Sequence, residues 1–493
     1  MSRIVVVGAG VGGLAAAARL AAAGHTVTIC EQAPVVGGKL GLLEREGFRF
    51  DTGPSLLTIP QAFTELFADT GAPLETVVDL QRVEPIARYR FADGVGLDAT
   101  SDLSDFARRL DAALSPGSGD DWRRFMARAA AIWNAVEGPF LRQPLAGPAD
   151  LLRQAVRLRD LATIAPHRTL RDLGRRYLRD PRLRLLLDRY ATYTGSDPRR
   201  APAALAAVPY AEQAFGAWYV GGGLYRLGEA IRDRAVERGA HVRTGAEVVG
   251  VELAGGRVAG VRLSSGERLA ADAVVANADA AHLYRDLVSG AAAAAARRRL
   301  ALAPASLSGF VALLGVGGTT PAIAHHNVLF PARYDAEFDD VFGPSPRPVA
   351  DPTLYVSVPR DPTAAPAGCE AWFVLVNAPR HEPGRGVDWD VPGLAGRYAD
   401  RIVALLAERG LDIRDRVLFR EMLTPADLQR RTRAVGGAIY GTSSNGRRAA
   451  FLRPANRSPV PGLFLVGGSS HPGGGLPLVT LSAQIVADII GPA

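Results

Sequence analysis

The sequence predicts an α/β fold with a parallel central sheet, and three observations support this prediction. The β-branched run at residues 4–7 is typical of a buried parallel strand. A glycine-rich turn and a helix of small residues, 14–23, follow it. A second strand then covers residues 26–30. Strand, glycine turn, helix and strand in this order form the βαβ unit that binds dinucleotides in Rossmann-like folds.

The first turn carries the residues that such a site requires. Gly8 permits a tight turn, Gly10 lets the backbone approach a pyrophosphate, and Gly13 brings the helix against the strand. Gly12 lies between them at the helix N-terminus, where unpaired N–H groups and the helix dipole favour an anion. Glu31 ends the second strand, where its carboxylate can accept hydrogen bonds from ribose hydroxyls. The sequence therefore predicts a site for an ADP moiety.

The residues that follow Glu31 decide between NAD and FAD. They read GGKL at 37–40 and FDTGPS at 50–55. Both segments resemble the FAD-dependent amine oxidase and phytoene desaturase superfamily, in which a GG-(R/K) loop and a D-x-G segment approach the flavin side of the cofactor. The resemblance implies FAD as the cofactor. It also implies contacts from Gly38, Lys39, Leu40, Gly53, Pro54 and Ser55.

Lys39 is the only lysine of the chain, and a compact ammonium suits a neighbouring diphosphate.

A third cofactor segment is predicted near the end of the sequence. Residues 463–466 read as a strand, a glycine-rich turn follows, and a helical pattern starts near Val479. In the superfamily this segment returns to the flavin, with the helix dipole near the ring's carbonyl edge. The sequence HPGGGLP at 471–477 resembles the corresponding segment of the bacterial-type carotenoid desaturases. The resemblance implies contacts from Gly467, Gly468, Leu476, Pro477 and Leu478.

Other segments resemble the same family along most of the chain: residues 193–198, 218–228, 239–251, 272–279, 325–327 and 453–456. Within them, Val248 would present backbone groups to the adenine, and Asn277 lies at the end of a cofactor-domain strand. The resemblance implies FAD-dependent desaturation of a linear carotenoid. The C-terminal segment GGGLPLVTLSAQ differs from the GAGIPG motif of enzymes that act on phytoene. It is closer to members that act on hydroxylated linear carotenoids, which favours 3,4-desaturation and leaves phytoene desaturation as the alternative.

Desaturation can proceed by hydride transfer to flavin N5 with loss of a proton from the neighbouring carbon, and the cofactor carries the difficult step. No catalytic side chain is assigned, although His471 and Glu212 are candidates for proton transfer. Three further functions stay open: a carotenoid isomerase, an amine-oxidising flavoenzyme, and a non-enzymatic prenyl-binding protein like the GDP dissociation inhibitors. The last should have a degraded nucleotide site, whereas Gly8, Gly10, Gly13 and Glu31 are intact.

Composition suggests a cytoplasmic protein that does not cross a membrane. The chain has 493 residues, enough for two domains, and 48% of them are hydrophobic. Its two cysteines, Cys30 and Cys369, offer neither a disulfide framework nor a metal set, so no metal is predicted. No apolar run reaches 18 residues. Oxygen or a quinone is the expected electron acceptor.

The net charge of +7 arises in one window, residues 151–200, which holds 13 arginines and five aspartates. Leu170, Leu173 and Tyr177 fall on one helical face, and arginines lie off it at positions 171, 175, 176 and 179. This pattern has two interpretations, a solvated surface or attachment to anionic lipid, from which a long hydrocarbon substrate must be drawn. We predict peripheral membrane association. No nucleic-acid recognition motif accompanies the arginines.

The order of segments predicts a discontinuous FAD-binding domain, made of residues 1–105, 205–290 and 415–493. Two insertions, 106–204 and 291–414, would form an α+β substrate domain over the flavin. The first insertion is predicted to be mainly helical. The second contains strand-like runs at 307–316, 353–358 and 372–377, separated by turns rich in proline.

Overall fold

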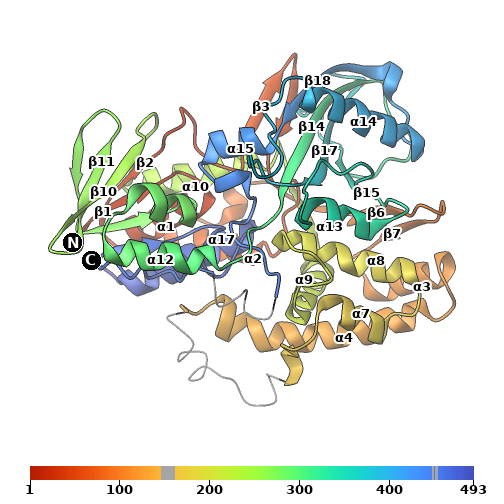
Figure 1. The fold of residues 1–493 in the computed structure, drawn as a ribbon, viewed down its shortest axis with the longest axis horizontal. Helices are drawn as coiled ribbons and strands as arrows, with labels where there is room; N and C mark the ends of the chain where they lie inside the picture. The colour runs from red at the N-terminus through yellow and green to blue at the C-terminus, as the bar shows by residue number, and fades with distance from the viewer. Residues whose placement is uncertain (146–161, 447–448, 450–452) are drawn as a thin grey trace.

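The structure is a computed structural model of the chain, and it describes residues 1–145, 162–446, 449 and 453–493. Figure 1 shows three regions: the parallel sheet with its helices, a large second sheet, and a helical layer below that sheet. The two chain ends lie close together beside the parallel sheet.

The parallel sheet has five strands, and they come from three separated parts of the chain. Their order is β19 (Leu463–Leu465), β13 (Ala273–Ala276), β1 (Arg3–Val7), β2 (Thr26–Cys30) and β9 (His241–Arg243). All four neighbouring pairs are parallel. The predicted strand, helix and strand at the N-terminus are confirmed, with α1 (Val11–Ala22) as the helix.

Both faces of β1 are buried, which explains its unbroken run of β-branched residues. Ile4 and Val6 pack with α1 and with three further helices. These are α2 (Gln61–Thr70), α10 (Tyr225–Glu237) and α17 (Leu476–Ile490). Val5 and Val7 face the other side. There they meet an antiparallel sheet of β10 (Val248–Ala254), β11 (Arg257–Leu263) and β12 (Arg268–Ala270), and the helices α11 (Ala280–His282) and α12 (Ala291–Ala301) lie nearby.

The second sheet has seven strands and is mostly antiparallel. Its order is β18 (Val417–Leu423), β14 (Ser308–Gly317), β17 (Cys369–Ala378), β16 (Leu354–Ser357), β15 (His326–Leu329), β6 (Ala87–Arg90) and β7 (Gly96–Ala99). The strands predicted in the second insertion are therefore confirmed as β14, β16 and β17. Alternate residues of β14 point to opposite faces: Phe310 packs toward α14 (Leu394–Glu408), whereas Val311 faces the interior of the molecule.

Sheet membership differs from the predicted domain boundaries at 105 and 415. β6, β7 and β18 pair within the seven-stranded sheet, although the sequence assigns them to the cofactor domain. Pairing with β15 and β14 decides where these strands lie, and such long-range pairing leaves no local signal. Two smaller antiparallel sheets have two strands each: β3 (Leu42–Arg45) with β4 (Phe48–Asp51), and β5 (Leu80–Val83) with β8 (Ala217–Val220).

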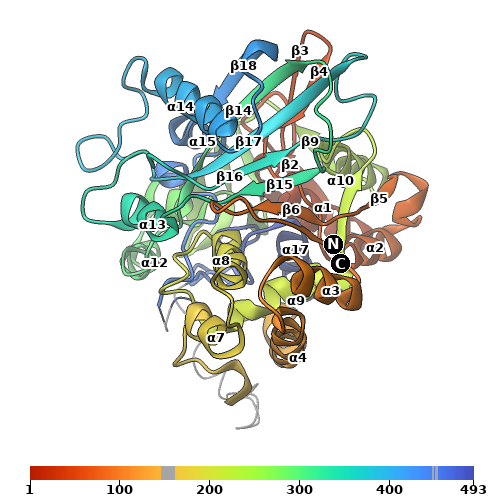
Figure 2. The ribbon, with the colours of Figure 1, turned by 90° about the vertical axis from the view of Figure 1, so that its right-hand side faces the viewer.

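The helical layer lies below the seven-stranded sheet, on the side away from α14 (Figure 2). It contains α3 (Leu103–Ala113), α4 (Ser118–Val136), α7 (Leu170–Tyr177), α8 (Pro181–Arg189) and α9 (Ala207–Phe215). The first insertion is thus mainly helical in its described part, as predicted. α13 (Tyr334–Phe342) joins this layer to the sheet, and α15 (Pro425–Thr432) follows β18.

Candidate active site

A cavity of about 1400 Å³ lies between the parallel sheet, the seven-stranded sheet and the helical layer. At one end it is lined by the glycine turns; at the other it is lined by α8, α9, α13 and the strands of the large sheet. The structure brings 17 of the 18 predicted cofactor residues to its wall: Gly8, Gly10, Gly12, Glu31, Gly38, Lys39, Leu40, Gly53, Pro54, Ser55, Val248, Asn277, Gly467, Gly468, Leu476, Pro477 and Leu478.

Gly13 is the exception, because it lies behind the turn. A Cβ atom at Gly13 would come 2.2 Å from the carbonyl oxygen of Gly8. Only glycine therefore allows α1 to pack this closely on β1. Gly13 shapes the site through the position of the helix and does not line the cavity.

Two helix N-termini open into the cavity. α1 has Gly10 as its N-cap and α17 has Gly475, and neither end has a capping side chain or an acidic residue in its first turn. The first N–H groups of each helix are therefore not satisfied by a cap, and each helix dipole places partial positive charge at the cavity wall. Both ends suit anionic parts of a dinucleotide.

The side chain of Asn277 packs directly against three of the glycines. A Cβ atom would come within 2.7 Å of the Asn277 amide at Gly10, 2.9 Å at Gly12 and 2.6 Å at Gly467. Asn277 directly follows β13 and fills the space between the two glycine turns. The three glycines leave the adjacent wall as bare backbone, which lets a ligand approach closely. This cradle fits the predicted dinucleotide.

The Glu31 carboxylate is held rigidly at the wall. Its Oε2 accepts a hydrogen bond from the Ala9 N–H at 2.6 Å, and its Oε1 accepts one from the Ala33 N–H at 2.9 Å. Glu31 is 6% exposed. Charge-assisted bonds of this kind fix the carboxylate where a ribose could reach it.

Lys39 is buried at the same end of the cavity. Its Nζ donates to the carbonyl oxygens of Ala438, at 3.0 Å, and Ile439. Burial lowers the pKa of Lys39 to about 8, against the opposing charge of Asp279, and Arg453 lowers it further. Arg453 is also buried, and it donates to the carbonyl oxygens of Tyr440, Gly468 and Thr442. Two cations thus lie by one end of the cavity.

A chain of hydrogen bonds leads from the cavity to the paired histidines. The Ser55 and Tyr355 hydroxyls are 2.7 Å apart, and the Tyr355 hydroxyl lies 2.9 Å from Nδ1 of His326. Burial lowers the pKa of His326 well below its usual value and the pKa of His325 to about 4. Both histidines are therefore neutral at pH 7. Tyr355 had no predicted role, because no motif in the sequence marks its contact with Ser55.

The two proton-transfer candidates lie in different surroundings. Glu212 lines the cavity, whereas His471 does not. The Nε2 of His471 lies 3.0 Å from the carbonyl oxygen of Gln143, and the imidazole ring meets Phe140 edge-on at 5.0 Å. Burial lowers the pKa of His471 to about 4. His471 thus anchors the segment around residues 140–143.

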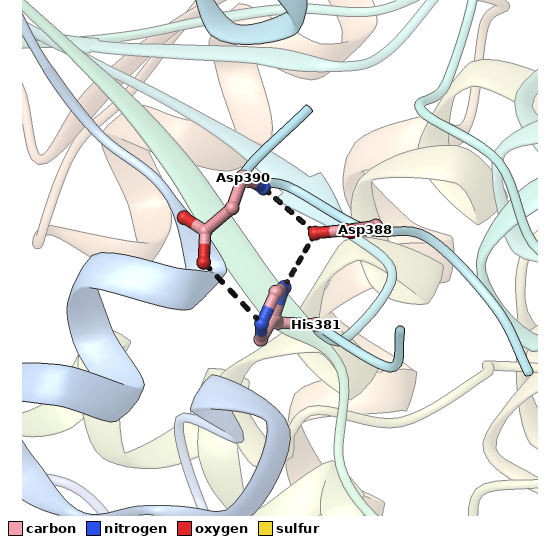
Figure 3. Close-up of side chains that lie close together, drawn as sticks. All are labelled: His381, Asp388 and Asp390. Atoms are coloured by element: carbon pink, nitrogen blue, oxygen red, sulfur yellow. Dashed lines mark hydrogen bonds and ion pairs between the residues drawn. The ribbon is translucent and has the colours of Figure 1, made fainter. Parts of the chain in front are cut away.

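One group of metal-ligating side chains is found among the described residues, and it lies away from the cavity: His381, Asp388 and Asp390 (Figure 3). Arg430 donates to both carboxylate oxygens of Asp390, at 2.8 and 3.0 Å. The Nδ1 of His381 accepts a hydrogen bond from the Trp389 N–H at 3.2 Å. The three side chains thus have protein partners, and their contacts stabilise the loop that carries Asp388 and Asp390.

The basic helix predicted to meet a membrane is α7, and its apolar face packs inside the protein. Leu170 and Leu173 are buried in the helical layer. Arg171 forms ion pairs with Asp188 at 2.8 Å and Asp335 at 2.6 Å. Only Arg175, Arg176 and Arg179 are exposed among the four arginines singled out, and Arg179 pairs with Asp121. The arginines at 153, 157 and 159 lie outside the described residues. In the described part of the chain, no helix is both long and apolar enough to cross a membrane.

A parallel sheet with two uncapped helix ends and a glycine cradle, joined to a second sheet over one cavity, defines a dinucleotide-binding protein. Comparison with known proteins identifies the kind. Residues 11–310 match the family model of flavin containing amine oxidoreductases.

Full-length relatives narrow this further. The chain is 36% identical to 4,4'-diapolycopene oxygenase of a Methylomonas species, over 99% of this chain and 98% of that protein. It is 35% identical to the zeta-carotene-forming phytoene desaturase of Myxococcus xanthus, over 99% and 93%. It is 31% identical to the 1-hydroxycarotenoid 3,4-desaturase of a Flavobacterium species, over 99% of each chain. The chain belongs to the carotenoid desaturase family of the flavin-containing amine oxidase superfamily, and it is a flavin-dependent oxidoreductase.

Solved structures agree on the fold. Putrescine oxidase bound to putrescine superimposes with a TM-score of 0.65 at 16% identity, covering 99% of both chains. An oxidoreductase from Methanosarcina mazei gives a TM-score of 0.62 at 18% identity, covering 99% of this chain and all of that one.

Proposed function

We propose that this protein is an FAD-dependent desaturase of a linear carotenoid, and that its reaction is the 3,4-desaturation of a hydroxylated carotenoid. Stepwise desaturation of phytoene is the alternative. The full-length relatives named for carotenoids support the substrate class. The observation that carries the proposal is that the glycine cradle and many apolar side chains line the same cavity. We call the apolar part of this cavity the tunnel.

The dimensions and walls of this cavity support two ligands bound together. Its volume of about 1400 Å³ exceeds the roughly 300–1,000 Å³ of common ligand pockets. Beyond the cradle, the wall consists largely of apolar side chains from α4, α9, β14 and β17: Trp133, Val136, Ala207, Val208, Ala211, Val311, Phe373 and Leu375. Such a wall suits a polyene and excludes water.

The predicted cofactor residues divide along the cavity. Gly8, Gly10 and Gly12 would hold the diphosphate, Glu31 the ribose, and Val248 the adenine. Residues 38–40, 53–55, 467–468 and 476–478 would surround the flavin. Bound flavin supplies the oxidising power by accepting two electrons as a hydride. The protein then needs mainly to orient the chain and keep the cavity dry, since a position 1 Å away from the productive one already slows transfer.

A second candidate function is oxygenation at the end of a linear carotenoid. It is favoured by the relatives at 36% and 33% identity, whose names are those of oxygenases. We further propose a cytoplasmic protein that touches the membrane through exposed arginines of α7, with oxygen or a quinone as the electron acceptor.

Mass analysis of products separates these possibilities. The FAD-loaded protein is supplied separately with phytoene, a 1-hydroxycarotenoid and a linear C30 carotenoid. We expect the 1-hydroxycarotenoid to become two hydrogens lighter. Efficient conversion of phytoene would reverse our order of substrates, and gain of an oxygen atom would establish oxygenation. Unchanged mass with altered double-bond geometry would indicate an isomerase, and peroxide release with amines alone would refute a carotenoid function.

A further inference from the structure

A group of buried polar side chains interrupts the apolar wall of the tunnel. Arg189 at the end of α8, Tyr193 just after it and Glu212 on α9 all line the cavity. Glu212 is 3% exposed and Arg189 6% exposed. The carboxylate of Glu212 accepts hydrogen bonds from the Tyr190 hydroxyl at 2.6 Å and the Tyr193 hydroxyl at 3.0 Å.

Arg189 completes this network from the other side. Its guanidinium donates to the Tyr193 hydroxyl at 2.8 Å and the Tyr89 hydroxyl at 3.1 Å. It also lies 5.0 to 5.8 Å from the ring centres of Tyr193, Tyr89 and Tyr190. Removing two opposite charges from water costs several kcal/mol per ion, and hydrogen bonds offset only part of that cost. A tunnel for a pure hydrocarbon gains nothing from such a group.

Tyr334 adds an independent observation in the same cavity. It belongs to α13, is 4% exposed and lines the cavity. Its hydroxyl has no hydrogen-bond partner among the described residues, and its ring packs edge-on against Phe330 and Phe338. An unpaired buried hydroxyl costs about 1–3 kcal/mol. Burial, with the charges of Glu337 and Asp188, raises its pKa well above the usual value, so the hydroxyl remains a donor.

We propose that Arg189, Tyr193, Glu212 and Tyr334 form a polar subsite that binds a hydroxyl or carbonyl oxygen at one end of the linear carotenoid. A hydroxyl can donate to the Glu212 carboxylate while it accepts from Tyr334 or Arg189, and a carbonyl can accept from the same donors. A hydrocarbon end leaves the Tyr334 hydroxyl without a partner and offers nothing to the free lone pairs of Glu212, so it binds less tightly. This inference rests on the proposed function and defines its substrate class.

The test compares two linear carotenoids of equal length and unsaturation, one with a 1-hydroxyl group and one without. For wild type we expect kcat/KM to favour the hydroxylated chain by at least about tenfold, and we expect an equal preference in binding, measured by fluorescence quenching. Tyr334→Phe should reduce that preference by about tenfold, the value of one hydrogen bond. Glu212→Gln should reduce it further, because a carboxylate is the stronger acceptor.

Tyr398→Phe is the matched control. Tyr398 is also a buried tyrosine, but its hydroxyl donates to the carbonyl oxygen of Val349 and it does not line the cavity. This variant should keep the wild-type preference. Flavin content, measured for each variant, reports that the protein is folded.

Different results would refute the polar subsite and the proposed desaturation reaction. If Tyr334→Phe and Glu212→Gln both keep the wild-type preference while both carotenoids are oxidised, the subsite is refuted and the proposed function stands. If the hydroxylated carotenoid binds with preference but is not oxidised, the subsite is supported and the proposed reaction is refuted. If neither carotenoid binds, both proposals are refuted.

Discussion

Substituting glycines in the first turn should separate cofactor binding from folding. Gly10 has φ −71° and ψ 168°, an extended conformation that valine also adopts. A Cβ atom there would meet only the Asn277 side-chain amide within 3 Å, and a side chain can rotate away. Gly10→Val should therefore fold. Its branched side chain would fill the space beside the first N–H groups of α1.

The size of the effect follows from the bonds lost. A diphosphate kept away from the start of α1 loses at least one hydrogen bond to a charged group, worth about 1.5–3 kcal/mol. That loss corresponds to about a 10- to 150-fold higher Kd for FAD. Gly13→Ala should behave differently, because its Cβ would lie 2.2 Å from the backbone oxygen of Gly8, which has no room to move. We expect Gly13→Ala to lower the yield of folded protein.

The assay measures flavin absorbance per protein and thermal unfolding for each variant. Gly396→Ala is the control, since a Cβ at this position in α14 meets nothing within 4 Å. Gly10→Val should have a melting temperature within a few degrees of that of the cofactor-free wild-type protein, and it should carry little flavin. Parental flavin content in Gly10→Val, or a normally folded Gly13→Ala, would refute the reasoning.

Three further predictions concern charged side chains. Because burial lowers the pKa of Lys39 to about 8, its ammonium loses its proton above that pH. The affinity of the cofactor-free protein for FAD should therefore be about tenfold lower at pH 9 than at pH 7. Titrations of the Lys39→Met variant with FAD should show no such decline. Replacing Arg175 and Arg176 by Gln should weaken sedimentation with anionic liposomes by about 1 kcal/mol per residue at low salt, and unchanged binding would reduce α7 to a solvated surface. Arg171→Gln should instead destabilise the fold by about 3–5 kcal/mol in denaturant titrations, since Asp188 would stay buried without its ion pair; an unaltered midpoint would contradict this.

The parts of the fold that the sequence predicts well are those with local causes. Gly8 and Gly10 mark a turn whose backbone requirements are met within six residues of chain. The continuous apolar runs of β14 and β17, which are largely buried, are also visible in the sequence. The α7 helix shows the limit of such patterns. Its apolar face and Arg171 are both used inside the protein, and the partner Asp335 lies 164 residues away. An amphipathic pattern alone does not tell which surface covers it.

The polar end of the tunnel has no sequence signal for the same reason. Arg189 and Tyr334 come from separate helices, α8 and α13, and both line the cavity. Neither belongs to a motif, and an arginine in an arginine-rich window suggests a solvated position. Burial of the charge depends on the tyrosines that surround it, and these come from β6 and from the end of α8. Only the folded chain brings them together.

The buried histidines bear on how much chemistry the protein itself performs. Burial lowers the pKa of His325 and His471 to about 4 and the pKa of His326 well below its usual value, so none of the three carries a charge at pH 7. None of them lines the cavity. A hydride leaving an allylic carbon creates a cation that loses its proton readily, so a strong protein base is unnecessary. The work of this chain is then to fix which carbon pair meets the flavin, and a polar subsite at one end of the tunnel sets that register along the polyene.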